Sequence, residues 1–207
     1  MLGAGGHARV LQEALALQGV VLHGFVAPTE ESQLGSCPWL GAEFDHLDPD
    51  AVLLVNGIGS ISEPEARQRV YLSAVAAGFS FASVIDATAI VRPSVELAPG
   101  VQVLAGAILN TDVVIGENAI INTGAIIEHG SRIGAHSHVS PAAALAGNVT
   151  IGETSHVGIG ARVIQGISVG SHCTIGAGAV VTRDVEDGST AVGVPAVSRS
   201  TEGRTSR

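Results

Sequence analysis

A six-residue repeat that runs for almost half of the chain constrains the fold more than any other feature of the sequence. Every sixth residue from Ile85 to Val181 is Ile, Val or Leu, without an insertion. The residue four places further on is small or Val at every position except Ile167. The aliphatic positions are Ile85, Val91, Leu97, Val103, Leu109, Ile115, Ile121, Ile127, Ile133, Val139, Leu145, Ile151, Val157, Val163, Val169, Ile175 and Val181. A helix needs apolar spacings of three and four and a half-buried strand alternates, so a period of six indicates a β-helix.

Composition and charge exclude several classes of protein. The formal net charge is −9, and all ten basic residues are Arg, which argues against a nucleic-acid-binding protein because such proteins need a dense basic patch. We find no apolar run of transmembrane length and no signal peptide, so we expect no membrane insertion and a cytoplasmic location. Cys37 and Cys173 lie far apart in the sequence, and Cys173 falls on an inward-facing small position, which favours a buried free thiol over a disulfide.

Residues 1–82 do not follow the period and read as alternating helices and strands. The pattern predicts a helix over Ala8–Gln18, ended by a glycine, and a second helix over Glu63–Ala77. Apolar strands are expected over Val20–Val26 and Ala51–Val55. This alternation favours a small parallel α/β domain of the Rossmann type.

The glycine-rich stretch before the first helix is a candidate ligand site. In a Rossmann-type domain it forms the turn from the first strand to the first helix, where backbone N–H groups can approach a phosphate. The loop after the Ala51–Val55 strand lies at the same edge of the sheet and is a second candidate for nucleotide contact. The residues expected to contact the ligand are Gly3, Gly5, Gly6, Asn56 and Gly57.

The boundaries follow from where the period begins and ends. We expect a Rossmann-like domain over residues 1–82, a β-helix with its closing segment over residues 83–197 and a flexible tail over residues 198–207. Only Met1 and Leu2 precede the glycines, so most of the first strand is missing. We expect either that the natural start lies upstream of Met1 or that another segment fills the gap.

Both halves together resemble the family of sialic acid O-acetyltransferases and nucleotide-linked amino-sugar N-acetyltransferases. The motifs that carry the resemblance are Gly3–His7, Ile121–His129, Ile133–Gly134, Ser137–Ser140, Ala146–Val149 and Gly193–Ala196. The resemblance implies a left-handed hexapeptide-repeat β-helix with three hexads in each coil, so that sixteen hexads give a little over five coils. It also implies a homotrimer that binds acetyl-CoA in the clefts between neighbouring helices and a sugar nucleotide at the N-terminal domain, with no metal.

The resemblance assigns roles to particular residues. His129 matches the catalytic general base, which takes a proton from the attacking amine. Relatives carry an acidic residue after this histidine, but here that residue is Gly130, so the carboxylate partner would be Glu128 or come from another coil or subunit. His138 matches a histidine near the thioester, and His7 one that faces the sugar nucleotide. The other residues that we expect to bind acetyl-CoA are Gly147, Asn148, Gly158, Gly176 and Pro195.

Two departures from the family pattern affect specificity. Val26 and Ala27 stand where many relatives have an acidic pair that reads the nucleotide base, which argues against uridine recognition by that route. Val197 stands where relatives often have a Lys near the CoA phosphates. The arginines that could substitute for it are Arg162, Arg183 and Arg199.

The leading hypothesis is therefore an acetyl-CoA-dependent N-acetyltransferase acting on a nucleotide-linked 4-amino sugar in surface-glycan synthesis. O-acetylation of sialic acid or a related sugar is an alternative, as is a non-catalytic trimeric scaffold that binds sugar nucleotides. A γ-type zinc carbonic anhydrase could use His129, His138 and His156, but the spacings do not match that pattern. We expect His136 and His172 to be exposed turn residues without a role.

Overall fold

A computed structural model describes residues 1–29, 34–59 and 64–200 of the chain. The chain divides into two compact units, Met1–Ala87 and Thr88–Arg207. Among the described residues, no helix is both long enough and apolar enough to cross a bilayer. Cys37 and Cys173 are both free, and Cys173 is buried as expected.

Short parallel strands form the sheet of the first unit, which confirms the expected Rossmann-like domain. Strand β1 (Leu53–Leu54) pairs in parallel with β2 (Ser80–Phe81). Leu2 forms parallel bridges with both Val26 and Asn56, so it lies between these two segments, and Phe25 bridges to Trp39. Most segments of this sheet contribute only one or two paired residues. The sheet therefore consists of isolated bridges as well as the strands β1 and β2.

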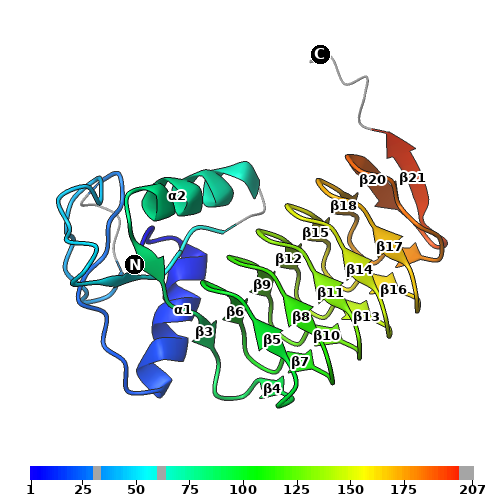
Figure 1. The fold of residues 1–207 in the computed structure, drawn as a ribbon, viewed down its shortest axis with the longest axis horizontal. Helices are drawn as coiled ribbons and strands as arrows, with labels where there is room; N and C mark the ends of the chain where they lie inside the picture. Colours follow the sequence, from blue (N-terminus) through cyan, green and yellow to red (C-terminus); the bar gives the residue numbers. More distant parts are fainter. Residues whose placement is uncertain (30–33, 60–63, 201–207) are drawn as a thin grey trace. The chain divides into compact units, whose positions relative to one another are not determined.

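Two helices flank the unit's strands (Figure 1). Helix α1 (Gly6–Leu17) follows directly after the glycine turn and ends before Gly19, whose φ of +75° suits a glycine. Helix α2 (Pro64–Ala76) is the helix expected over residues 63–77, although residue 63 lies outside the described residues. Strand β3 (Val84–Ile85) lies near the C-terminal end of this unit. The core residues are Leu2, Val26, Leu54, Tyr71, Ala74, Phe79 and Phe81.

The second unit is a parallel β-helix, as the hexad period predicts, and it has the architecture that the family resemblance implies. Its two-residue strands recur every six residues and pair with the strand eighteen residues away, as in Ile126↔Ala144 and Ile126↔Ile108. The stacked coils are visible in Figure 1. One face consists of β4 (Ile90–Val91), β7 (Ile108–Leu109), β10 (Ile126–Ile127), β13 (Ala144–Leu145), β16 (Arg162–Val163) and β19 (Val180–Val181). The second consists of β5 (Glu96–Leu97), β8 (Val114–Ile115), β11 (Arg132–Ile133), β14 (Thr150–Ile151) and β17 (Ser168–Val169). The third includes β6 (Gln102–Val103), β9 (Ile120–Ile121), β12 (His138–Val139), β15 (His156–Val157), β18 (Thr174–Ile175), β20 (Ser189–Val192) and β21 (Val197–Ser200).

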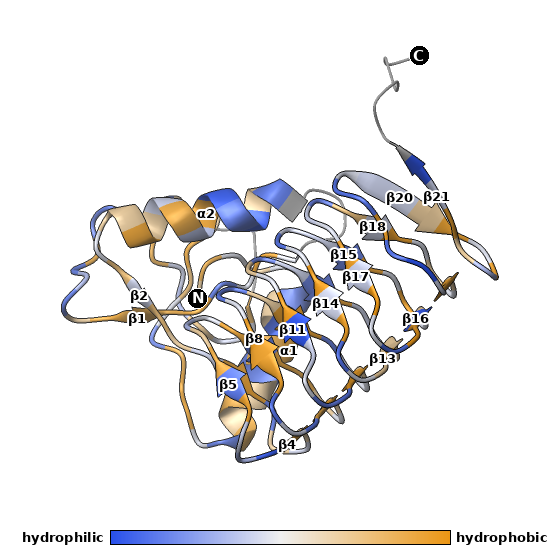
Figure 2. Ribbon diagram, turned by 45° about the vertical axis from the view of Figure 1, so that its right-hand side comes forward, coloured by the Kyte–Doolittle hydropathy of each residue, from blue (hydrophilic) through white to orange (hydrophobic). Residues whose placement is uncertain are grey.

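In the two-residue strands of the coil, the second residue faces the interior and the first faces outward. Arg132 of β11 is exposed while Ile133 is buried, and Thr150 and Ile151 of β14 repeat this arrangement. Figure 2 shows the same order as a change from hydrophilic to hydrophobic colour along β11. The interior is therefore filled by the aliphatic residues of the repeat, and the small residue four places later is buried with them.

The strand at the C-terminal end of the third face corrects one expectation. Residues 198–200, which we expected in a flexible tail, belong to β21, which pairs antiparallel with β20 from Val192↔Val197 to Ser189↔Ser200. The pairing satisfies backbone groups that the end of a parallel face would otherwise leave open. Residues 201–207 lie outside the described residues.

A serine ladder inside one corner of the coil satisfies backbone groups that the hexad turn leaves unpaired. The Ser155 hydroxyl donates to the Gly170 carbonyl (2.8 Å) and accepts from the Cys173 amide (2.9 Å). Ser137 makes the matching pair of bonds one coil earlier, to the Gly152 carbonyl and the Ser155 amide. Each hydroxyl therefore joins two coils through one partly buried carbonyl and one buried amide.

We expect Ser155→Ala to lower the free energy of unfolding by about 1–3 kcal/mol, because it leaves a buried amide and a partly buried carbonyl without partners. Denaturant unfolding followed by circular dichroism measures this. Ser168→Ala is the control, since Ser168 is exposed on β17 and should change stability by less than about 0.5 kcal/mol. Equal midpoints for the two variants would show that the ladder contributes no stability.

Candidate active site

The imidazole of His129 lies against the bare backbone of Gly147, one coil further along. A Cβ atom placed on Gly147 would lie 2.5 Å from both Cε1 and Nε2 of His129. The two residues are eighteen positions apart, so they occupy the same corner of successive coils, and the Asn148 amide donates to the His129 carbonyl (2.8 Å). His129 is exposed, whereas Gly147 is buried. The lack of a side chain at Gly147 is what lets the ring come this close to the next coil.

The His129 imidazole lies beside the backbone of Gly147, and both residues carry an open hydrogen-bonding group in the described part of the chain. Among the described residues, the Gly147 N–H forms no hydrogen bond, and the His129 ring forms neither a hydrogen bond nor an ion pair. An exposed imidazole can accept a proton from an incoming group, and a nearby unpaired amide can donate to a developing oxyanion. The pair has the parts that acyl transfer requires.

Glu128 is directed at another coil. Its Oε1 accepts a hydrogen bond from Asn110 Nδ2 (3.0 Å), and no bond joins it to His129 in the described part of the chain. Gly130, which takes the place of the family's acidic residue, has a φ of +69° and lies beneath the Asn148 side chain. A Cβ at this position would collide with the Asn148 carboxamide oxygen, so this corner accommodates Asn148 rather than a carboxylate.

His138 lies on the neighbouring face with two polar partners around it. Asn122 Nδ2 is 3.0 Å from His138 Nε2, and the rings of His138 and His156 meet edge to face with centroids 4.9 Å apart. The Ser140 hydroxyl is 3.1 Å from His156 Nε2, and burial lowers the pKa of the His156 imidazole. Within the described ranges, no three His, Cys, Asp or Glu side chains gather in a way that could hold a metal ion.

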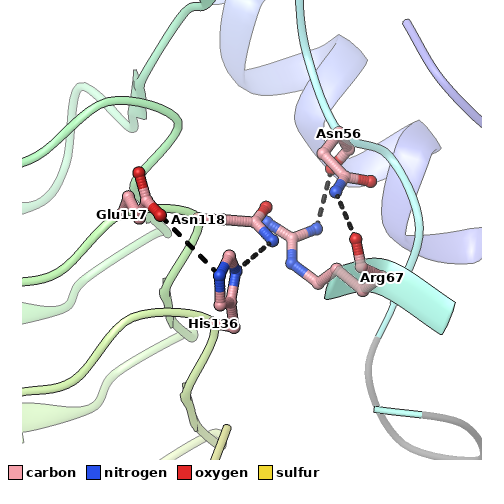
Figure 3. Close-up of polar contacts among 5 residues, drawn as sticks. All are labelled: Asn56, Arg67, Glu117, Asn118 and His136. Atoms are coloured by element: carbon pink, nitrogen blue, oxygen red, sulfur yellow. Dashed lines mark hydrogen bonds and ion pairs between the residues drawn. The ribbon is translucent and has the colours of Figure 1, made fainter. Parts of the chain in front are cut away.

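His136 differs from its expected role as an exposed residue. It is 6% exposed, and its Nδ1 lies 3.0 Å from Asn118 Nδ2 while its Nε2 lies 3.8 Å from a Glu117 carboxylate oxygen (Figure 3). Asn118 and His136 both have positive φ and are eighteen residues apart. The turn conformation therefore stacks their side chains on each other instead of directing them into water.

The remaining residues expected to bind acetyl-CoA have packing reasons for their identity. A Cβ on Gly158 would lie 2.6 Å from the Ile175 carbonyl oxygen, and one on Gly176 would lie 2.8 Å from a methyl group of Val192. Pro195 is exposed in the connection between β20 and β21. Of the expected set, Gly147 and Asn148 contact His129, whereas Gly158, Gly176 and Pro195 lie further along the coil.

The glycine turn and the second loop of the first unit line one pocket. Its volume is about 430 Å³, and its lining consists of Gly3, Gly5, Gly6, His7, Gly57, Ile58 and Gly59. Helix α1 begins there with Gly5 as its N-cap and has no side-chain cap, so its first amides are available to a ligand. The structure brings together the two segments that the sequence singled out separately.

Asn56 lies beneath this pocket and does not line it. Its side chain is 1% exposed; Nδ2 donates to the Arg67 carbonyl (3.2 Å), and Oδ1 accepts from the Ile58 amide (3.2 Å). Arg67 of α2 returns two bonds to the loop (Figure 3). Asn56 therefore acts on the pocket through the loop that it holds.

Several residues of these sites were missed in the sequence. Arg67 braces the loop that lines the pocket, Asn110 bonds to Glu128, and Asn122 lies within hydrogen-bond distance of His138. Ile58 and Gly59 line the pocket and belong to the loop that the sequence had already singled out. Asn110 shares a spacing of eighteen with its partner, so the coil period could have identified it. Arg67 carried a weaker signal, a charge at the same helical spacing as buried Tyr71 and Ala74.

Comparisons with known proteins match both units. The model for the PglD N-terminal domain matches residues 1–73, and the model for the hexapeptide repeat of succinyl-transferase matches residues 148–183. A comparison with curated protein sequences gave no significant match.

Three solved structures match over nearly the whole chain. A mutant of perosamine N-acetyltransferase from Caulobacter crescentus, in complex with CoA and GDP-perosamine, is 40% identical with a TM-score of 0.90, covering 96% of this chain and 94% of that one. The acetyltransferase domain of PglB from Neisseria gonorrhoeae, in complex with acetyl coenzyme A, is 34% identical with a TM-score of 0.89, covering 95% and 96%. WeeI from Acinetobacter baumannii, at 22% identity and a TM-score of 0.85 over 96% and 97%, shares the fold.

Proposed function

Because the chain belongs to the hexapeptide-repeat sugar N-acetyltransferases with a PglD-type N-terminal domain, we propose that it transfers an acetyl group from acetyl-CoA to the amine of a nucleotide-linked 4-amino sugar. The observation that carries the proposal is the His129 imidazole beside the unpaired amide of Gly147. The 40% identical relative that holds GDP-perosamine and CoA supports the class of both substrates.

The reaction needs a base more than it needs an acid. The sugar amine attacks the thioester carbonyl carbon, His129 accepts the proton that the nitrogen loses, and the C–S bond breaks to release the CoA thiolate. The Gly147 N–H donates to the carbonyl oxygen while it carries negative charge. The thiolate then takes up one proton, so the products are the sugar acetamide and CoA.

Each substrate has its own part of the chain. We assign the sugar nucleotide to the 430 Å³ pocket of the first unit, where Gly3, Gly5 and Gly6 surround the start of α1. Acetyl-CoA is assigned to the β-helix, where His138 and Asn148 accompany His129. Val26 and Ala27 provide no acidic group for reading uridine, so a GDP-linked sugar is the first acceptor to test.

The assembly that we propose is a homotrimer in the cytoplasm, where acetyl-CoA is available. His129 is exposed and its ring lacks a partner among the described residues, which is the condition expected of a group that meets its substrate at a subunit boundary. Gly130 has no side chain, and Glu128 is bonded to Asn110. The group that orients the His129 ring would therefore come from the substrate or from a neighbouring subunit.

Release of free CoA thiol from acetyl-CoA tests the proposal with four classes of acceptor: GDP-linked 4-amino sugars, UDP-linked 4-amino sugars, free amino sugars and sialic acids. We expect free CoA thiol only when the acceptor is a nucleotide-linked amino sugar. Release with sialic acid would instead indicate O-acetylation. If no acceptor releases CoA and calorimetry detects no binding of acetyl-CoA, the protein is a sugar-nucleotide-binding scaffold and the proposal of an acetyltransferase is wrong.

A further inference from the structure

Arg67 is a fully buried cation in helix α2. Its side chain is 0% exposed, and burial lowers the pKa of its guanidinium to about 9. The group is still protonated at neutral pH, and a buried charge is costly unless hydrogen bonds compensate for it. An arginine kept at such a position therefore needs an explanation in the groups that it contacts.

Two of those groups are carbonyls of the loop that lines the glycine pocket. Arg67 Nη1 donates to the carbonyl oxygens of Asn56 (2.9 Å) and Ile58 (2.7 Å). The Asn56 side chain closes the arrangement by donating to the Arg67 carbonyl and accepting from the Ile58 amide. Figure 3 shows Asn56 and Arg67 facing each other across these bonds. The loop is thus held from its buried side by one charged donor and one carboxamide.

The bond to Ile58 fixes the direction of the next amide. Among the described residues, only the Val194–Pro195 peptide bond is cis, so the Ile58–Gly59 bond is trans and planar. In a trans peptide the C=O and the following N–H point in opposite directions. Because the Ile58 carbonyl points at Arg67, the Gly59 N–H points away from it. Gly59 lines the pocket beside His7, whose Cβ lies 3.8 Å from the position a Gly59 Cβ would take.

We propose that Arg67 is a positioning residue of the acceptor site: it locks the Ile58–Gly59 peptide with its amide turned toward the pocket, where that amide donates a hydrogen bond to an oxygen atom of the bound sugar nucleotide. The inference rests on the proposed function for the identity of the ligand. It rests on the Arg67 contacts alone for the orientation of the loop. Without the guanidinium, the two carbonyls lose their donor and the peptide is free to rotate.

Steady-state kinetics of Arg67→Lys and Arg67→Met test this. Lysine replaces the planar guanidinium, which donates to both carbonyl oxygens, by a compact ammonium group. Methionine provides no hydrogen-bond donor. We expect KM for the sugar nucleotide to rise about tenfold in Arg67→Met, the loss of roughly one net hydrogen bond, and less in Arg67→Lys. KM for acetyl-CoA should stay within twofold. Arg69→Met is the matched control: Arg69 lies on the same helix, is 65% exposed and pairs with Glu65 at 3.9 Å.

The kinetic split separates positioning from a purely structural role. Loss of folded enzyme would lower the apparent kcat and leave both KM values unchanged, and that result would overturn the proposal. If Arg67→Met does not fold, the comparison of KM for the sugar nucleotide between wild type and Arg67→Lys tests the proposal. Thermal unfolding checks that Arg67→Lys is folded. An unchanged KM for the sugar nucleotide in a folded Arg67→Lys enzyme would count against positioning.

Calorimetric binding of GDP provides a readout that does not depend on turnover. If wild type binds GDP but acetylates no sugar nucleotide, the proposed function fails, and weaker GDP binding by Arg67→Lys than by Arg69→Met still supports the loop assignment. Equal GDP affinity in Arg67→Lys and Arg69→Met overturns it. If wild type binds neither GDP nor any sugar nucleotide, both the proposed function and this inference are wrong.

Discussion

Replacing His129 by asparagine should lower kcat by about 10²–10⁴-fold, the usual contribution of a positioned general base. The reason lies in the substrate, because an amine attacks a thioester only once it has lost a proton, and asparagine cannot accept one. The change corresponds to roughly 3–5 kcal/mol of transition-state stabilisation. Free CoA thiol release at saturating acetyl-CoA and acceptor measures it, and KM for acetyl-CoA should change little.

His172→Asn is the control for this substitution. His172 is an exposed turn residue of the same β-helix with a φ of +55°, a conformation that asparagine accepts readily. We expect its kcat to equal that of the wild type. The residual activity of His129→Asn should rise with pH, since more of the amine is then deprotonated without help. A His129→Asn enzyme within about threefold of wild type at neutral pH would rule out His129 as the base.

The fold could be predicted from the sequence because the β-helix repeats one local rule. Each hexad places an aliphatic residue inside the coil, so the phase from Ile85 to Val181 specifies the strands. The coil of three hexads that the resemblance implies specifies their pairing at a spacing of eighteen. The glycine turn and the loop after β1 were identified for a similar reason, because both follow strand ends at one edge of a parallel sheet. Their meeting in a single pocket follows from that topology.

Side-chain orientation was less accessible, because it depends on groups that no local pattern specifies. His136 occupies a turn position that predicts exposure, yet Asn118 captures its ring one coil earlier. Arg67 sits at a helical position that an apolar residue would normally fill, and its partners are carbonyl oxygens, which have no sequence signature. Asn56 was identified as a ligand contact because of its loop, and only the structure places its side chain beneath that loop.

Glu128 illustrates the same limit within the acetyl-transfer site. Its position next to His129 made it the nearest candidate carboxylate, but successive residues at a coil corner point in different directions. The structure pairs it with Asn110, eighteen residues earlier, on the face formed by β7 and β10. The catalytic role of Glu128 therefore remains a hypothesis. Substitution of Asn110, which removes the hydrogen bond that holds Glu128, would test it.

Gly147→Ala should lower kcat by about 10²-fold while leaving the fold intact. The added methyl group would lie 2.5 Å from His129 Cε1 and Nε2, so the ring must move by about 1 Å to restore ordinary contact, a displacement that can cost this much in rate. Gly147 is not among the residues with positive φ, so its backbone accepts alanine without strain. Free CoA thiol release measures the effect, and thermal unfolding should remain close to that of wild type.

Gln165→Ala is the control, because Gln165 occupies the same corner one coil further on and is exposed. It should retain wild-type kcat. A kcat of Gly147→Ala within threefold of wild type would mean that the ring has room to adjust, and that its place over Gly147 does not determine the rate.

The double variant His129→Asn/Gly147→Ala distinguishes the two ways in which Gly147 can act. If the methyl group works by displacing the base, it has nothing left to displace once His129 is gone, and the double variant should be no slower than His129→Asn alone. If the methyl group instead disturbs the Gly147 amide that we propose as the donor to the thioester oxygen, the two losses should multiply. The first result would assign Gly147 to the placement of the base, and the second would assign it to stabilisation of the oxyanion.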